Sequence, residues 1–278
     1  MNPAALTEDL VVALFGGKAA QLAAAKRAGL PVPAGVALPY GFVDAAAADE
    51  RDARQQLAAV FHALDAPLVA RSSAVGEDSE QASFAGQHLT QLNLRSESEF
   101  VDAVCAIWRS ARSPSALAYR ERLGLPREPR MAVLVQELVE ADTAGVLFSR
   151  NPVNGSDELV VEAAWGLGES VVAGLVIPDR FRLSRDGAVV ERIAGLKDLA
   201  IRIDPQGGTS RTHVPEGLAR VLCLDDAQLA ALHALALRCD EVFGGSHDLE
   251  WAFAGGRLYL LQRRALTAMP SAAIETPA

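Results

Sequence analysis

Residues 71–87 gather the side chains best suited to binding a polyphosphate. The segment opens with Arg71-Ser72-Ser73, continues through the carboxylates Glu77-Asp78 and ends in the small-residue turn Ser83-Phe84-Ala85-Gly86. A guanidinium binds phosphate oxygens through two parallel hydrogen bonds. Small residues let backbone N–H groups approach those oxygens closely. A polar surface loop has a similar composition, so this segment by itself leaves both interpretations open.

Two further patterns suit the same ligand. Gly16-Gly17-Lys18 is expected at a turn that opens a helix over residues 19–28, where backbone N–H groups and the helix dipole favour anions. Gln136 and Leu138 close an apolar strand, an edge at which adenine can meet backbone groups and one amide side chain. Each pattern also has an ordinary explanation, because Lys18 could be a solvated helix lysine and Gln136 could simply satisfy a strand end.

Asp248, Glu250, Gln262 and Arg264 are expected on the two strands of one hairpin. Residues two apart on a strand face the same side, so Asp248 would lie beside Glu250, and Gln262 beside Arg264. A carboxylate next to an amide oxygen suits Mg²⁺, and an arginine beside them can hold a phosphate. An edge-strand charge pair is the plain alternative. The patterns occurring together, in this order, favour a nucleotide-phosphate site.

The motifs of other common sites are missing. Lys18 is followed by Ala19, and position 12 is Val12, so Gly17-Lys18 is not a P-loop. Gly166-Leu167-Gly168 lacks the third glycine of a dinucleotide-binding turn. Ser246-His247-Asp248 does not predict a triad, because sequence neighbours do not converge on one point. The net charge of −9 argues against nucleic acid or an anionic membrane as the main partner.

The 278 residues are 50% hydrophobic and 22% charged, which predicts a globular chain of one large domain or two lobes. Its three cysteines have no C-x-x-C spacing, which favours buried, reduced thiols in a cytosolic protein. We find no signal peptide and no apolar run of the ~18 residues that a membrane span needs. The expected location is therefore the cytoplasm.

Hydrophobic periodicity predicts an α+β chain with helices first and strands after them. We expect helices over 19–28, 44–64, 97–112, 115–123 and 225–243, and strands over 67–70, 131–139, 145–149, 158–164, 180–184, 189–193, 199–203, 249–253 and 258–261. The segment 126–129 is the best linker candidate. This pattern predicts a helix-rich lobe over 1–127, a strand-rich lobe over 128–268 and a flexible tail over 269–278. Clefts between lobes are common ligand sites.

From about Phe15 to Thr267, the chain resembles the nucleotide-binding domain of the phosphoenolpyruvate synthase and pyruvate phosphate dikinase family, which rifamycin phosphotransferases share. The resemblance is carried by Gly16-Gly17-Lys18, Ala28-Gly29-Leu30-Pro31-Val32-Pro33, Arg71-Ser72-Ser73, Glu77-Asp78-Ser79, Ser83-Phe84-Ala85-Gly86-Gln87, Ala144-Gly145-Val146-Leu147-Phe148-Ser149, Asn151-Pro152, Glu162-Ala163-Ala164-Trp165-Gly166-Leu167-Gly168-Glu169, Pro178-Asp179, Asp248-Leu249-Glu250-Trp251, Leu260-Leu261-Gln262 and Arg264. It implies an ATP-grasp fold with two lobes and ATP in the cleft between them.

The resemblance also implies roles for individual positions. Lys18 and Arg71 are similar to the family's phosphate-holding cations, and Arg264 to the arginine near the transferred phosphoryl group, so these three are the expected catalytic residues. Ser83, Ala85 and Gly86 are similar to a small-residue lid over the phosphates. Gln136 and Leu138 are similar to the adenine edge. Glu250 and Gln262 are similar to the Mg²⁺ ligands. Such a site suits phosphoryl transfer, which relies on positioning and charge neutralisation.

The chain departs from the family by its length, because full members carry a swivelling domain whose histidine takes the phosphoryl group. His247 follows a glycine pair but leads directly into the Asp248–Trp251 motif, so it belongs to the nucleotide domain. We therefore expect an ATP·Mg²⁺-binding phosphotransferase that passes a phosphoryl group to a histidine domain on a separate chain, and on to pyruvate or another small acceptor. The alternatives are a standalone small-molecule kinase, a non-catalytic nucleotide-binding module and, less favoured by these motifs, a carboxylate–amine ligase.

Overall fold

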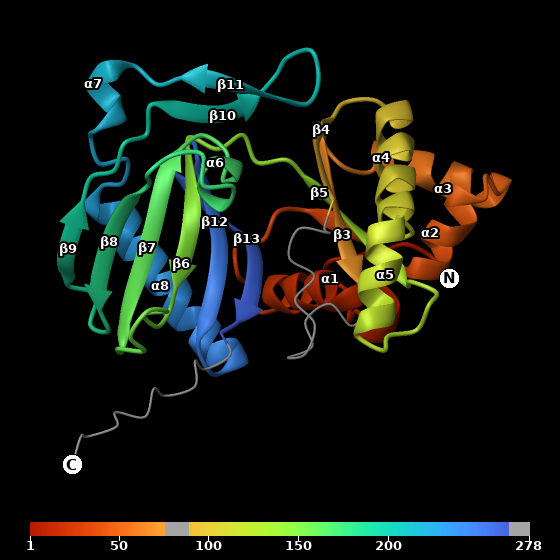
Figure 1. Ribbon diagram of the computed structural model, residues 1–278, viewed down its shortest axis with the longest axis horizontal. Coiled ribbons are helices and arrows are strands. Elements are labelled where there is room, and N and C mark those ends of the chain that lie inside the picture. The colour runs from red at the N-terminus through yellow and green to blue at the C-terminus, as the bar shows by residue number, and fades with distance from the viewer. Residues whose placement is uncertain (76–88, 267–278) are drawn as a thin grey trace.

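The computed structural model describes residues 1–75 and 89–266 (Figure 1). The lid expected at Ser83, Ala85 and Gly86 lies outside the described residues. The described helices are α1 (Val12–Arg27), α2 (Tyr40–Ala47), α3 (Arg51–His62), α4 (Glu97–Ser110), α5 (Pro114–Arg122), α6 (Glu169–Val172), α7 (Glu216–Ala219) and α8 (Asp226–Phe243). None of them is both long enough and apolar enough to cross a membrane.

The first sheet has the order β1-β2-β5-β3-β4, and every neighbouring pair is antiparallel. Its strands are β1 (Ala4–Ala5), β2 (Gly35–Leu38), β3 (Leu68–Ala74), β4 (Thr90–Leu94) and β5 (Met131–Glu137). Helices α2, α3 and α4 cover one face through a core that includes Phe42, Leu57 and Phe100. Strand β5 follows the expected linker yet lies in the middle of this sheet, where its continuous run of buried residues is covered. The division of the chain at residues 127 and 128 stays a prediction.

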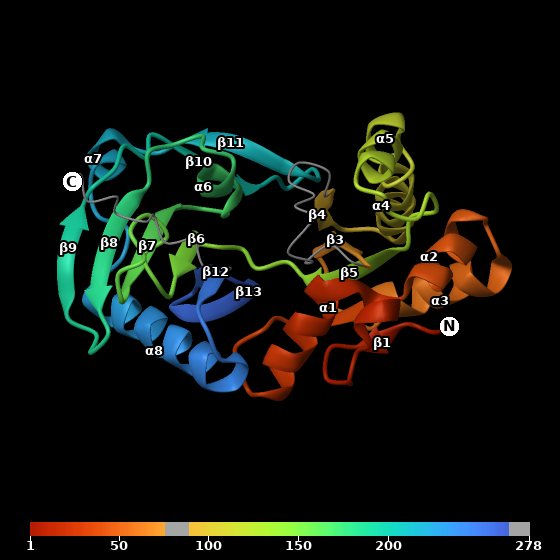
Figure 2. The ribbon, with the colours of Figure 1, turned by 60° about the horizontal axis from the view of Figure 1, so that its bottom comes forward.

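The second sheet has the order β13-β12-β6-β7-β8-β9 and is also fully antiparallel. Its strands are β6 (Thr143–Phe148), β7 (Glu158–Trp165), β8 (Asp179–Ser184), β9 (Val189–Ile193), β12 (His247–Ala254) and β13 (Arg257–Ala265). Helix α8 covers one face of this sheet (Figure 2). As predicted, Asp225 caps α8, and it forms a reciprocal capping box with Gln228. A separate hairpin is formed by β10 (Leu199–Ile203) and β11 (Thr209–His213).

Helix α1 joins the two sheets. One hydrophobic core contains Leu22 of α1, Leu134 of the first sheet and Leu260 of the second sheet. Just after α1, the Pro31 carbonyl accepts a hydrogen bond of 2.9 Å from the Leu260 N–H. This shared core fixes the faces that the two sheets turn towards each other.

Two of the expected helix boundaries are wrong. The helix predicted over 44–64 is two helices, α2 and α3, because Asp49 has a φ of 62° and ends the helical path. Asp tolerates this left-handed conformation better than most residues, since its short side chain can hydrogen-bond locally. The helix expected from residue 19 begins earlier, at Val12, and passes through a kink at Gly16. Strand β11 has no counterpart in the sequence-based prediction.

Candidate functional site

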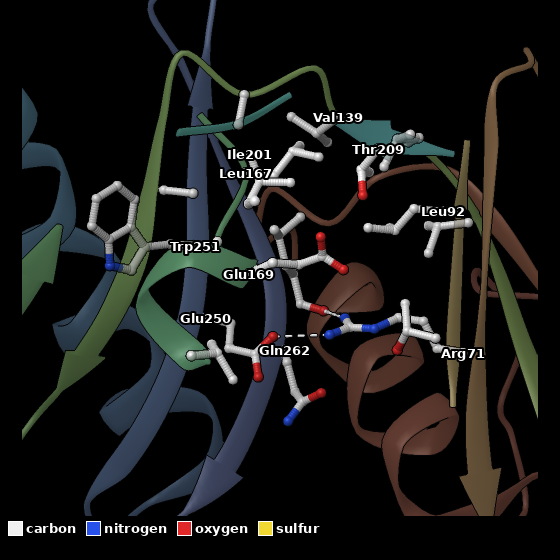
Figure 3. A pocket seen from close by; sticks show the side chains of 18 of the residues that line it. Arg71, Leu92, Val139, Leu167, Glu169, Ile201, Thr209, Glu250, Trp251 and Gln262 are labelled. Atoms are coloured by element: carbon white, nitrogen blue, oxygen red, sulfur yellow. Dashed lines mark hydrogen bonds and ion pairs between the residues drawn. The ribbon is translucent and has the colours of Figure 1, made fainter. Parts of the chain in front are cut away.

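The described residues enclose a cavity of about 570 Å³ between the two sheets, with the β10–β11 hairpin along one side (Figure 3). It brings together Lys18, Arg71, Gln136, Leu138, Glu250, Gln262 and Arg264. These are all the predicted site residues that the structure describes. These residues come from four separate segments of the sequence, and the fold brings them together in one pocket.

The glycine pair before Lys18 produces the kink in α1. Gly16 has a φ of 76° and a ψ of 165°, and a Cβ atom there would lie 2.2 Å from the Ser73 carbonyl oxygen. The Ser73 hydroxyl donates to the Phe15 carbonyl (2.8 Å) and accepts from the Ala19 N–H (3.1 Å). Only glycine fits this close approach in this conformation. The kink therefore seats the helix directly on strand β3.

Lys18 lies in the turn after this kink and is almost fully buried. Its Nζ donates to the Ser72 carbonyl at 3.0 Å, on the strand that also carries Arg71. The structure thus places two cations, Lys18 and Arg71, on the first-sheet side of the pocket.

Arg71 crosses the pocket floor to the second sheet (Figure 3). Its Nη1 donates to the Leu261 carbonyl at 2.7 Å, and its Nη2 donates to Glu250 Oε2 at 2.8 Å. The Arg71 and Glu250 side chains are 15% and 24% exposed, so the ion pair is only partly screened by water. The guanidinium has five N–H donors, of which these two have partners among the described residues.

The predicted hairpin is confirmed, with Glu250 opposite Gln262 and Asp248 opposite Arg264. With its amide oriented to satisfy both atoms, Gln262 Oε1 accepts two hydrogen bonds of 2.8 Å from Arg264. Asp248 Oδ1 is buried and has no hydrogen-bond partner among the described residues. Burial and the neighbouring Glu250 charge raise the pKa of the Asp248 carboxyl, and Arg264 opposes that shift. This end of the pocket therefore concentrates carboxylate, amide and guanidinium groups.

Gln136 lies in β5 on the first-sheet wall of the pocket and is almost fully buried. Its Nε2 has no hydrogen-bond partner among the described residues. The Leu138 N–H, in contrast, donates to the Pro67 carbonyl at 2.9 Å. Leu138 can therefore meet a ligand through its carbonyl or side chain, whereas the Gln136 amide is a buried donor that lacks an acceptor. Buried polar groups normally have a partner, which marks this atom as a candidate ligand contact.

Several pocket residues were missed by sequence reasoning. Leu167 and Glu169 line the second-sheet side, and Ile201 and Thr209 come from the β10–β11 hairpin (Figure 3). Burial raises the pKa of the Glu169 carboxyl, and a hydrogen bond from Thr209 acts in the opposite direction. The glycine pair 207–208 was the available signal for this hairpin, but strand β11 is too polar to stand out by hydrophobic pattern.

His247 lies outside the pocket. It is fully buried at the start of β12, and its Nδ1 faces the Arg263 guanidinium, with Nη2 at 3.1 Å. Burial and the Arg263 charge lower the pKa of His247, although Asp240 opposes the shift. The predicted assignment of His247 to the nucleotide domain agrees with this position, which is inaccessible to a phosphoryl donor in solution.

The sequence profile of the pyruvate phosphate dikinase AMP/ATP-binding domain matches residues 42–277. The chain belongs to this family. Membership confirms the expected α+β ATP-grasp fold, with two antiparallel sheets facing one another across a pocket. It also identifies the chain as an AMP/ATP-binding domain of the pyruvate phosphate dikinase type.

Three relatives illustrate the family. A probable phosphoenolpyruvate synthase from Methanothermobacter thermautotrophicus is 37% identical over 214 residues, which cover 76% of this chain and 31% of that protein. The prodigiosin synthesizing transferase PigC from Serratia marcescens is 34% identical over 300 residues (96% and 34%). A rifampicin phosphotransferase from Streptomyces sviceus is 36% identical over 201 residues (72% and 23%). The chain spans about a third or less of the length of these relatives.

Similar solved structures include a dinucleotide-forming acetyl-coenzyme A synthetase from Ca. Korarchaeum cryptofilum, with a TM-score of 0.44 at 13% identity, covering 86% of each chain. A D-alanine–D-alanine ligase from Helicobacter pylori gives a TM-score of 0.43 at 10% identity, covering 91% of this chain and 54% of that one.

Proposed function

We propose that the pocket binds ATP·Mg²⁺ and that the domain transfers a phosphoryl group from ATP to a histidine carried by a separate domain or chain, which passes it to pyruvate or a similar small acceptor. The observation that carries this proposal is the opposite character of the two pocket ends. Arg71, Glu250 and Gln262 lie together in one part of the pocket, and Val139, Leu167 and Ile201 in another (Figure 3). Lys18, Arg264 and Gln136 also line it, and Gln136 Nε2 has no partner among the described residues.

The apolar end suits a nucleobase. Gln136 Nε2 needs an acceptor, and a base nitrogen supplies one in the plane of the ring. Val139, Leu167 and Ile201 also line the pocket, where they lie near one another, and would cover the faces of a flat ring (Figure 3). Burying the ring between them removes apolar surface from water, while the Gln136 amide fixes its orientation.

The charged end suits a triphosphate. Three of the five Arg71 N–H donors have no hydrogen-bond partner among the described residues, so the guanidinium has donors available for phosphate oxygens. Lys18 adds a second cation from the kinked helix, and Arg264 adds a third from β13. Phosphoryl transfer spreads negative charge over the transferred group, which cations at fixed positions stabilise.

The residues present fit a magnesium ion that binds together with the nucleotide. Glu250 and Gln262 are opposite each other in the hairpin and carry a carboxylate and an amide oxygen, which are ligands that Mg²⁺ accepts. The Gln262 oxygen would exchange a hydrogen bond from Arg264 for the metal ion. No group of three or more His, Cys, Asp or Glu side chains in the described part of the chain could hold a metal alone. Mg²⁺ commonly uses one or two protein ligands and completes its shell with phosphate oxygens and water. When bound, it neutralises charge on the phosphates.

The phosphoryl acceptor must come from outside the described pocket. None of the described histidines lines the cavity, and His247 is buried at the start of β12. A histidine on another domain could reach the open phosphate end, as the resemblance to the dikinase family implies. Pyruvate is then the leading final acceptor.

The test is to incubate the purified chain with Mg²⁺ and ATP labelled in both the β- and γ-phosphoryl groups, with and without a candidate histidine-domain partner and pyruvate. We expect acid-labile label on the partner, and its loss when Lys18→Met replaces the buried cation. A variant outside the pocket, Arg185→Ala, should retain transfer. Acceptor-dependent turnover without any partner would instead identify a standalone kinase. ATP binding without turnover under all conditions would identify a non-catalytic module.

A further inference from the structure

The β10–β11 hairpin forms a strap along the nucleotide pocket. This strap, residues 199–213, extends from the side of the second sheet to the edge of the first sheet at β4 (Figures 1 and 2). Ile201 and Thr209 of the strap line the cavity (Figure 3). Whatever holds the strap therefore shapes one side of the pocket.

The base of the strap is fastened to the second sheet by buried groups. The carboxylate of Asp179 on β8 accepts hydrogen bonds from the Lys197 ammonium and from the N–H groups of Gly195 and Cys223, and both charged side chains are fully buried. The Ile201 carbonyl also accepts a hydrogen bond of 2.9 Å from the Leu167 N–H. An ion pair with this many additional hydrogen bonds fixes the position of the base.

The tip of the strap is held by one side chain of the first sheet. Asn93 of β4 is 1% exposed, and its Nδ2 donates to the carbonyls of Asp204 and Gly208, each at 2.7 Å. Its Oδ1 accepts from Arg95 Nε at 2.8 Å. Within the described residues, the hydrogen bonds between the strap and the first sheet are these two from Asn93.

The tip does not need Asn93 in order to form. The Asp204 and Gly208 carbonyls also accept hydrogen bonds from the Gly207 and Asp204 N–H groups, at 3.0 and 3.1 Å. Those bonds close the turn by themselves, so the Asn93 amide adds attachment rather than local structure. Asn93 has a φ of 61°, a conformation that asparagine and glycine tolerate, which keeps its amide aimed at the tip.

We propose that Asn93 is a positioning residue of the nucleotide site: it latches the strap to the first sheet and so holds Ile201 and Thr209 against the bound nucleotide. This inference rests on the proposed function. Release of the strap from β4 would then take Ile201 and Thr209 away from the bound nucleotide, which weakens the complex and speeds its dissociation.

The latch itself is tested without any ligand by amide hydrogen exchange. Two neutral hydrogen bonds of ordinary net strength correspond to about a 5- to 150-fold change in an equilibrium constant. Asn93→Gly removes the side chain but tolerates the positive φ, and Asn93→Asp keeps the shape but removes the donor. Both should accelerate exchange at residues 204–209 by about that factor, with the β12–β13 hairpin unchanged as the reference. Arg95→Ala, which leaves both Nδ2 bonds in place, should match the wild type.

Unchanged exchange at 204–209 in both Asn93 variants would overturn the latch. If neither variant folds, hydrogen exchange of the wild type still tests the latch. A latched Asn93 side-chain amide must exchange far more slowly than an exposed one. The positioning role is then tested by ATP·Mg²⁺ titration and stopped-flow dissociation. We expect weaker binding in both Asn93 variants, through a faster off-rate, and normal binding in Arg95→Ala. Faster exchange at 204–209 in the Asn93 variants with unchanged ATP affinity would refute the positioning role. Absence of ATP binding by the wild type would refute the proposed function itself.

Discussion

Replacing Arg71 by alanine separates a phosphate-binding role from a purely structural one. Arg71 makes one hydrogen bond to the Glu250 carboxylate and one to the Leu261 carbonyl. A surface ion pair contributes about 0–1 kcal/mol, and breaking a buried one costs about 3–5 kcal/mol. This pair is partly exposed, so we expect Arg71→Ala to lower the free energy of unfolding by roughly 1–3 kcal/mol.

Arg71→Ala should also weaken ATP binding, because it removes a contact to phosphate as well as a contact within the protein. A hydrogen bond to a charged group contributes about 1.5–3 kcal/mol, so losing a single phosphate contact weakens ATP binding by about 10- to 150-fold. Arg71→Lys keeps the charge but loses the planar pair of donors. Its ATP affinity should therefore lie between those of the wild type and Arg71→Ala.

Arg185 provides a matched control. Like Arg71, it donates to a carboxylate and to a carbonyl, Asp240 at 2.6 Å and Ser149 at 3.2 Å; its Nε also lies 3.6 Å from Asp157 Oδ1, and it does not line the pocket. Arg185→Ala should therefore cost comparable stability and leave ATP affinity unchanged. Calorimetric ATP·Mg²⁺ titrations and denaturant unfolding at one ionic strength measure both quantities. If Arg71→Ala loses stability but binds ATP normally, Arg71 is a structural clamp and the phosphate assignment is wrong.

Three further predictions concern other groups. Glu250→Gln should abolish the dependence of ATP affinity on Mg²⁺, measured by titration with and without the ion, and a retained dependence would contradict the metal role. Because burial raises the pKa of Glu169, the folded protein binds that proton more tightly than the unfolded chain, and stability falls as the pH rises through the folded-state pKa. Glu169→Gln should therefore be more stable than the wild type at pH 7, with no advantage below ~pH 4, as followed by urea unfolding. Burial raises the pKa of Cys239 to about 12, so a thiol reagent at pH 8 should label it only after denaturant is added; labelling in the native protein would contradict this.

The sequence predicted best those features that depend on local pattern. The alternation around Glu250 and Gln262, with a glycine pair at 255–256, was sufficient to place the two residues on the paired strands of one hairpin. It could not reveal that the glycine before Lys18 seats a kinked helix on Ser73, because that contact joins residues far apart in the chain. The sheet to which β5 belongs was hidden for the same reason.

The strap was missed for a different physical reason. Its second strand is polar along its whole length, so it carries no hydrophobic period from which a strand can be predicted. What gives it a fixed place is the buried Asp179–Lys197 pair at its base and the Asn93 amide at its tip. Buried polar groups with long-range partners of this kind become visible only when the fold is known.

The Arg71–Glu250 ion pair should couple the binding of metal to the binding of nucleotide at the proposed site. Each of these partly buried charges is the other's partner across the pocket floor. ATP·Mg²⁺ offers each charge a new partner: phosphate oxygens would pair with the guanidinium, and the metal ion with the carboxylate. Mg²⁺ alone would have to take Glu250 while leaving Arg71 unpaired, and ATP alone would bring its negative charge beside Glu250. Either partner by itself should therefore bind weakly, and the complex of the two should bind far more tightly than the separate affinities suggest.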